Sequence, residues 1–82
     1  MKTEYKHIRF EKIREGKRTS EWNCMNKSGQ YLGTVMWYFP WRQYCFYTDD
    51  GETYFSGGCL NDIKDFMLDL RKHELEARRP ND

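Results

Sequence analysis

Residues 30–48, QYLGTVMWYFPWRQYCFYT, are the most informative stretch for the fold. Two ring-rich runs, 30–39 and 42–48, lie on either side of Pro40-Trp41. Proline has no N–H to donate inside a sheet, so it marks a turn or a bulged edge here. The stretch therefore predicts a β-hairpin. Neither face of its first strand is clearly polar, so both faces need cover.

Chain segments on both sides of this hairpin continue the β-pattern, and turn signals separate them. Asn26-Lys27-Ser28-Gly29 and Asp49-Asp50-Gly51 are such signals, because Asn, Asp and Gly tolerate the backbone conformations of tight turns. The sequence therefore predicts an antiparallel β-meander of four or five strands, at residues 5–14, 21–26, 30–39, 42–48 and 52–55.

The C-terminal part of the chain has a helical pattern. Ser56-Gly57-Gly58 ends the β-pattern and opens a helix expected at about residues 59–76. Leu68 and Leu75 lie off its apolar stripe, either as two exposed leucines or as the seam of a dimer or partner contact. The stripe itself spans an arc of about 100° and comprises Cys59, Leu60, Ile63, Phe66, Met67 and Leu70.

These elements make an α+β fold, an antiparallel β-meander packed on one C-terminal α-helix. A chain of 82 residues builds one hydrophobic core, so residues 1–82 form a single domain. Approximately residues 1–4 and 77–82 are expected to be flexible tails.

Rings dominate the apolar residues, with five Phe, three Trp and six Tyr against nine Ile, Leu and Val together. One helix covers only one face of a sheet, so the second face must carry part of this aromatic set. Contiguous exposed apolar patches on monomers usually serve an interaction. The second face is therefore the candidate binding surface.

The densest group of candidate binding residues lies within residues 37–44. Tyr, Trp and Arg dominate the hot spots of protein interfaces, and they also stack on nucleic-acid bases. For Trp37 a core position is the competing interpretation, whereas Arg42 stands out as the single basic residue between Lys27 and Lys64. The predicted binding residues are Trp37, Tyr38, Trp41, Arg42 and Tyr44.

The sequence contains no motif typical of a catalytic or metal-binding site. His7 and His73 lack a nucleophile or carboxylate at a motif spacing, and the three cysteines form no C-x-x-C pair. Ser56-Gly57-Gly58 before a helix suits a phosphate, but the following Asp62 and Asp65 oppose an anion. We expect no enzyme activity, no metal and no cofactor.

Charge and hydropathy limit the partners. Basic and acidic residues are nearly balanced, 14 against 13, which argues against a strongly basic nucleic-acid binder. Residues 1–18 are mainly basic and residues 48–76 mainly acidic, so one end of the fold is expected to be positive and another negative. No apolar run has the roughly 20 residues of a membrane span. A cytoplasmic protein without membrane contact is expected.

Residues 22–66 also carry a signature that resembles a known family. The family comprises small uncharacterised proteins of phages, prophages and bacterial genomes. The resemblance implies a phage-type genetic context and brings no catalytic residues. Its residues are Trp22, Asn26-Lys27-Ser28-Gly29, Leu32-Gly33, Trp37-Tyr38, Trp41-Arg42-Gln43-Tyr44-Cys45-Phe46, Cys59-Leu60, Asp62-Ile63 and Phe66.

The leading hypothesis is a small non-catalytic accessory protein of phage type. It would bind a host protein or complex, related to defence or replication, through an aromatic and arginine-bearing sheet face. One alternative is a nucleic-acid or nucleotide binding module that uses stacked Trp and Tyr with Arg42 and the basic N-terminal strand. Another is a homodimer that buries the ring face against a second copy.

Overall fold

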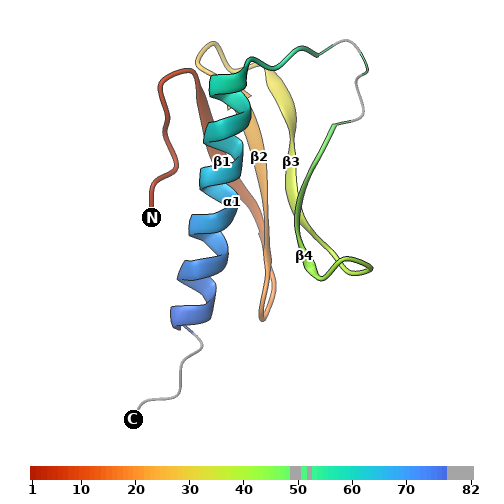
Figure 1. The fold of residues 1–82 in the computed structure, drawn as a ribbon. Helices are drawn as coiled ribbons and strands as arrows, with labels where there is room; N and C mark the ends of the chain where they lie inside the picture. The colour runs from red at the N-terminus through yellow and green to blue at the C-terminus, as the bar shows by residue number, and fades with distance from the viewer. Residues whose placement is uncertain (49–50, 52, 78–82) are drawn as a thin grey trace.

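The computed structural model describes residues 1–48, 51 and 53–77 (Figure 1). The described strands form one antiparallel sheet in the order β1-β2-β3-β4, followed by a helix. This arrangement confirms the predicted α+β meander with four strands. In chain order the elements are β1 (Ile8–Glu15), β2 (Ser20–Asn26), β3 (Tyr31–Tyr38), β4 (Gln43–Tyr47) and α1 (Gly57–Ala77).

The predicted fifth strand does not form in residues 53–55, and Glu52 lies outside the described residues. The ring of Phe55 instead packs edge-on against the ring of Phe46 in β4, with centroids 5.5 Å apart. This short segment therefore extends the apolar cover of the sheet and leaves the main-chain pairing to the four longer strands.

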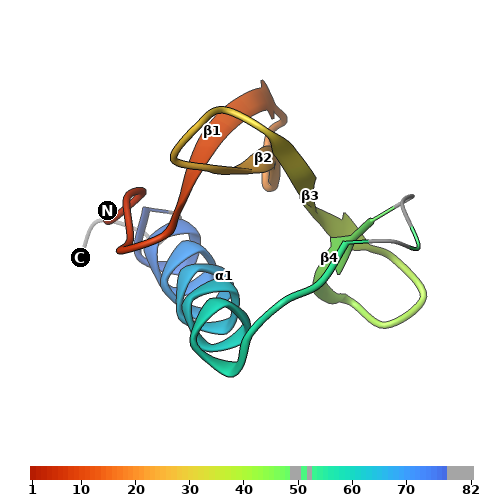
Figure 2. The ribbon, with the colours of Figure 1, turned by 90° about the horizontal axis from the view of Figure 1, so that it is seen from above.

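The sheet curves around one side of α1, as Figure 2 shows from above. Two irregularities in the strand pairing accompany the curvature, one between Lys12 and Arg14 and one between Cys24 and Met25. Such bulges bend a strand and increase its twist. The face that the sheet turns toward α1 holds the core, and the opposite face is called the open face below.

The core is built from rings stacked between sheet and helix. Phe66 of α1 lies flat on Phe10 of β1, with centroids 3.9 Å apart, and meets Trp22 of β2 edge-on at 5.2 Å. Aromatic pairs in these geometries contribute beyond their buried area. The buried apolar side chains are Tyr5, Ile8, Phe10, Trp22, Cys24, Val35, Tyr44, Ile63, Phe66 and Leu70.

The helical stripe was predicted correctly except at its margin. Ile63, Phe66 and Leu70 are buried, and Cys59 and Met67 pack partly buried against the core. Leu60, which lies at the edge of the apolar arc, is 54% exposed.

The start of α1 is set by Ser56. Its Oγ accepts a hydrogen bond from the backbone N–H of Cys59 at 3.1 Å, the geometry of a helix N-cap. The helix begins at Gly57, two residues before the predicted start, so Asp62 and Asp65 fall beyond the first turn.

The N-terminal residues are bound to the sheet. The N–H of Phe10 donates to the carbonyl oxygen of Thr3 at 2.8 Å, and Glu4 forms an isolated bridge with Arg9 and an ion pair with Lys27. Thr3 and Glu4 thus contact the sheet, within the stretch 1–4 for which a flexible tail is expected. In the C-terminal tail, Ala77 ends α1, and residues 78–82 lie outside the described residues.

The N-terminal segment, which carries Lys2 and Lys6, runs beside α1 (Figures 1 and 2). Asp65 and Asp69 of α1 line one hollow together with Lys2 and Tyr5. Burial raises the pKa of Tyr5, and the negative charges of Asp69, Asp65 and Asp62 raise that pKa further. Lys2 lies over the same ring at 4.4 Å. The two charged stretches are thus neighbours in this region, contrary to the expectation of separate positive and negative ends.

Candidate functional site

The β3–β4 connection forms a ring-bearing turn at one end of the molecule. Tyr38 pairs with Gln43 at the ends of the two strands, and four residues link them. The turn is closed by hydrogen bonds from the N–H of Trp41 to the carbonyl oxygen of Tyr38 (3.2 Å) and from the N–H of Arg42 to that of Phe39 (3.1 Å). The rings of Tyr38 and Trp41 meet edge-on with centroids 5.0 Å apart. We call Tyr38, Phe39, Trp41 and Arg42 the aromatic turn.

The rings of the aromatic turn are open to solvent. Phe39 is 78% exposed, Trp41 66% and Tyr38 44%. Burial of large apolar side chains is favourable, so a partner that covers these rings gains binding free energy. The aromatic turn thus places three exposed rings within four consecutive residues.

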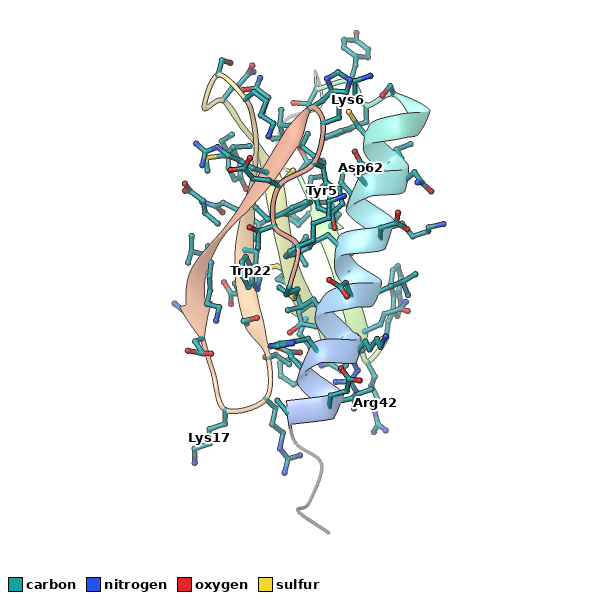
Figure 3. The ribbon with its side chains drawn as sticks, turned by 90° about the vertical axis from the view of Figure 1, so that its left-hand side faces the viewer. Tyr5, Lys6, Lys17, Trp22, Arg42 and Asp62 are labelled. Carbon is teal, nitrogen blue, oxygen red and sulfur yellow. The ribbon has the colours of Figure 1, made fainter. Side chains whose placement is uncertain are left out.

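Arg42 occupies an uncommon backbone conformation. Its φ of 53° lies in the left-handed region, which disfavours residues with a Cβ. Its side chain points away from the body of the protein, at the end that also carries Lys17 (Figure 3). Among the described residues no carboxylate forms an ion pair with Arg42. The guanidinium is therefore presented to solvent beside the exposed rings.

Trp37 and Tyr44, the other two predicted binding residues, face the helix. They are cross-strand partners in β3 and β4, and their rings meet edge-on at 5.3 Å. The guanidinium of Arg71 in α1 lies 4.7 Å from the centroid of the Trp37 ring, a cation–π contact that covers this half-buried ring. Side chains alternate along a strand, so Trp37 and Tyr38 point to opposite faces.

Tyr44 is buried and belongs to a polar network between sheet and helix. Its hydroxyl donates to Oε1 of Glu74 at 2.6 Å and accepts from the N–H of Ser20 at 3.0 Å. Ser20 Oγ donates to Oε2 of Glu74 at 3.3 Å and accepts from Nε1 of Trp22 at 2.8 Å. Burial, with the hydrogen bond to Glu74, raises the pKa of Tyr44 to about 12. Tyr44 thus joins β4 to β2 and α1.

The structure therefore divides the predicted binding residues into two groups. Tyr38, Trp41 and Arg42 belong to the aromatic turn, whereas Trp37 and Tyr44 are directed to the core side. Phe39 was not among the predicted site residues although it is the most exposed ring of the turn. Its position directly before Pro40 was the signal that could have placed it there.

The open face carries two further exposed rings. Tyr31, on β3 with Thr34, is 43% exposed, and Tyr47, the partner of Thr34 on β4, is 55% exposed. The hydroxyl of Tyr31 shares a 2.6 Å hydrogen bond with Oγ1 of Thr34, which in turn donates to Oδ1 of Asn23 at 3.1 Å. The open face is thus a mixed aromatic and polar surface that continues from Tyr38.

Other sites receive no support from the described part of the chain. No group of three or more His, Cys, Asp or Glu side chains there is arranged to hold a metal ion. Burial raises the pKa of the Cys24 thiol to about 12, which keeps it protonated and unreactive at neutral pH. Within residues 1–48, 51 and 53–77, no helix combines the length and apolar character of a membrane span.

Comparisons with known proteins give no family or neighbour for this chain. No protein-family model matches it, and searches of the curated proteins and of the solved structures return no match.

Proposed function

We propose that this chain is a small non-catalytic binding protein that acts by stoichiometric occupation of a partner through the aromatic turn and the adjoining open face. The partner is proposed to be a host protein or complex connected with defence or replication. That context, with a phage-type origin and a cytoplasmic location, rests on the resemblance of residues 22–66 to the phage and prophage family.

One observation carries this proposal, namely the exposure of Phe39 and Trp41 at a tightly bonded turn. Burial of one such large apolar side chain stabilises by about 1.5 to 3 kcal/mol. The turn already fixes the backbone, so less conformational entropy is lost on binding than for a mobile loop. A rigid cluster of this kind suits the centre of a protein interface.

Arg42 gives the binding surface a charged group that can orient the partner. A guanidinium recognises carboxylates and carbonyl groups through several N–H donors, and Arg42 directly follows Trp41 in the turn. We expect an acidic or carbonyl-rich group of the partner opposite Arg42, next to an apolar pocket that receives Trp41.

Affinity capture from a lysate of the proposed bacterial host tests this function. The wild type, the double variant Trp41→Ala/Arg42→Ala and a control, Ile13→Ala/Arg14→Ala at two exposed positions of β1, are immobilised in equal amounts. A partner should be retained in stoichiometric amount by the wild type and by the control, and lost from the turn variant. Equal retention by all three proteins, or no retained protein at all, would contradict the proposal.

Nucleic-acid or nucleotide binding is the second candidate. Exposed Tyr38 and Trp41 rings lie beside Arg42, and Lys17 lies at the same end of the molecule (Figure 3). Titration of the tryptophan fluorescence with a single-stranded oligonucleotide tests it, because binding through phosphates falls steeply with salt. Salt-sensitive quenching that Trp41→Ala abolishes would favour this candidate over a protein partner.

A further inference from the structure

The two edges of the sheet differ in how they are protected. At the β1 edge, the chain folds back so that the N–H of Phe10 donates to the carbonyl oxygen of Thr3, and Glu4 bridges Arg9. β1 as a whole is rich in charge, with the sequence IRFEKIRE. Covering segments and charged side chains are the usual means by which proteins prevent a further strand from pairing.

Within the part of the chain that the structure describes, the outer edge of β4 has neither protection. Its sequence, QYCFY, contains no charged residue and no proline, and among the described residues β4 pairs with β3 alone. Unpaired N–H and C=O groups along such an edge form a template for another strand. Exposed Tyr47 and Trp41 lie at the two ends of this template.

We propose that β4 pairs antiparallel with β4 of a second copy, which gives a two-fold symmetric dimer with one continuous sheet. The strand is complementary to itself. With Cys45 on the two-fold axis, Gln43 lies opposite Tyr47 and Tyr44 lies opposite Phe46, so amide meets phenol and ring meets ring. No like charges oppose each other within this strand pair, and the net charge of +1 adds almost no repulsion between copies.

The dimer goes beyond the proposed function, because it requires no other partner. It joins the two open faces into a single surface with Cys45 and Tyr47 of both copies at its centre. It also carries two aromatic turns, so the dimer presents two equivalent binding surfaces. A partner with a matching repeat would then bind more tightly than one with a single site.

Sedimentation equilibrium tests the dimer. A five-residue edge makes a small interface, so we expect the wild type to pass from monomer to dimer between about 1 μM and about 1 mM. Cys45→Lys, which sets two ammonium groups against each other at the axis, should remain monomeric, and so should Tyr47→Lys. The matched control Ile13→Lys, an equally exposed position on β1, should dimerise as the wild type does.

Thermal melts establish that all three lysine variants are folded. A wild type that stays monomeric over the whole range would overturn the proposal. Undiminished dimerisation of both folded β4 variants would overturn it as well, and so would equal loss of the dimer in Ile13→Lys.

Cross-linking tests the register. In Cys24→Ala/Cys59→Ala, Cys45 is the remaining thiol, and diamide takes two electrons and two protons from a thiol pair to form the disulfide. Directly opposed Cα atoms in an antiparallel pair are about 4.5 to 5.5 Å apart, within disulfide range. This protein should therefore form covalent dimers at concentrations where the wild type is dimeric.

Position 43 supplies the matched control. With Cys45→Ser added and Gln43→Cys introduced, two copies of position 43 lie about 14 Å apart, beyond disulfide range. This chain should cross-link only when mixed with a chain that carries Tyr47→Cys in the same background. Ready cross-linking between two copies of position 43, or none at Cys45 in the dimer, would refute the register.

Discussion

Replacing Tyr44 by Phe tests whether this residue is structural. The substitution keeps the ring and removes the hydroxyl that donates to Glu74 and accepts from the N–H of Ser20. A typical hydrogen bond contributes about 1 kcal/mol, and a buried donor left without an acceptor costs about 1 to 3 kcal/mol. Ser20 is 5% exposed, so its N–H has little access to water. We therefore expect the free energy of unfolding to fall by about 2 to 4 kcal/mol.

Urea unfolding followed by circular dichroism measures this loss. Tyr47→Phe is the matched control, because it removes the same atom from the same strand at a 55% exposed position, and it should change stability by less than about 0.5 kcal/mol. In an 82-residue domain the Tyr44→Phe loss corresponds to a Tm lower by roughly 10 to 25 °C. If Tyr44→Phe is as stable as Tyr47→Phe, the hydrogen bonds of the Tyr44 hydroxyl do not contribute the stability assigned to them.

Three further predictions concern the core. Phe66→Ala should lower the free energy of unfolding by about 3 to 5 kcal/mol in a urea titration, because it empties the space between Phe10 and Trp22. Gly33→Ala should cost about 1 to 3 kcal/mol by the same measurement, since its Cβ would lie 2.4 Å from Cζ of Phe46. The pKa values of Cys24 and Tyr44 are raised from 9.0 and 10.0 to about 12, so the folded state keeps protons that the unfolded state loses. The stability that these two protonated groups contribute should therefore be complete below pH 9 and should be lost between pH 9 and 12. Urea midpoints that rise over this range would contradict the raised pKa values.

The elements of the fold were predictable because their signals are local. Pro40 and the turn residues 26–29 act on their own backbone, so they located strand ends without knowledge of the rest of the chain. The helical period likewise identified Ile63, Phe66 and Leu70 as the buried stripe. The prediction of a strand at 52–55 was wrong for its described residues, 53–55, because composition alone does not show whether a partner strand lies beside a short run.

The orientation of the candidate site could not be predicted, and the reason is physical. Both faces of β3 carry rings, so no polar face shows which side the helix covers. The contacts that direct Trp37 and Tyr44 inward come from Arg71 and Glu74, about 30 residues later in the chain. Such pairings depend on tertiary packing, which leaves no periodic signal in the sequence.

A thermal melt of Trp41→Ala/Arg42→Ala beside Ile63→Ala, with partner capture on the same preparations, tests most directly whether the aromatic turn is a binding surface. Trp41 is 66% exposed and Ile63 is buried. The turn variant should melt close to the wild type while its partner affinity falls by about 2 kcal/mol or more. Ile63→Ala should lose about 2 to 5 kcal/mol of stability through the cavity it leaves. A turn variant that melts as early as Ile63→Ala would show that Trp41 and Arg42 support the fold, and the assignment of the binding surface would be wrong.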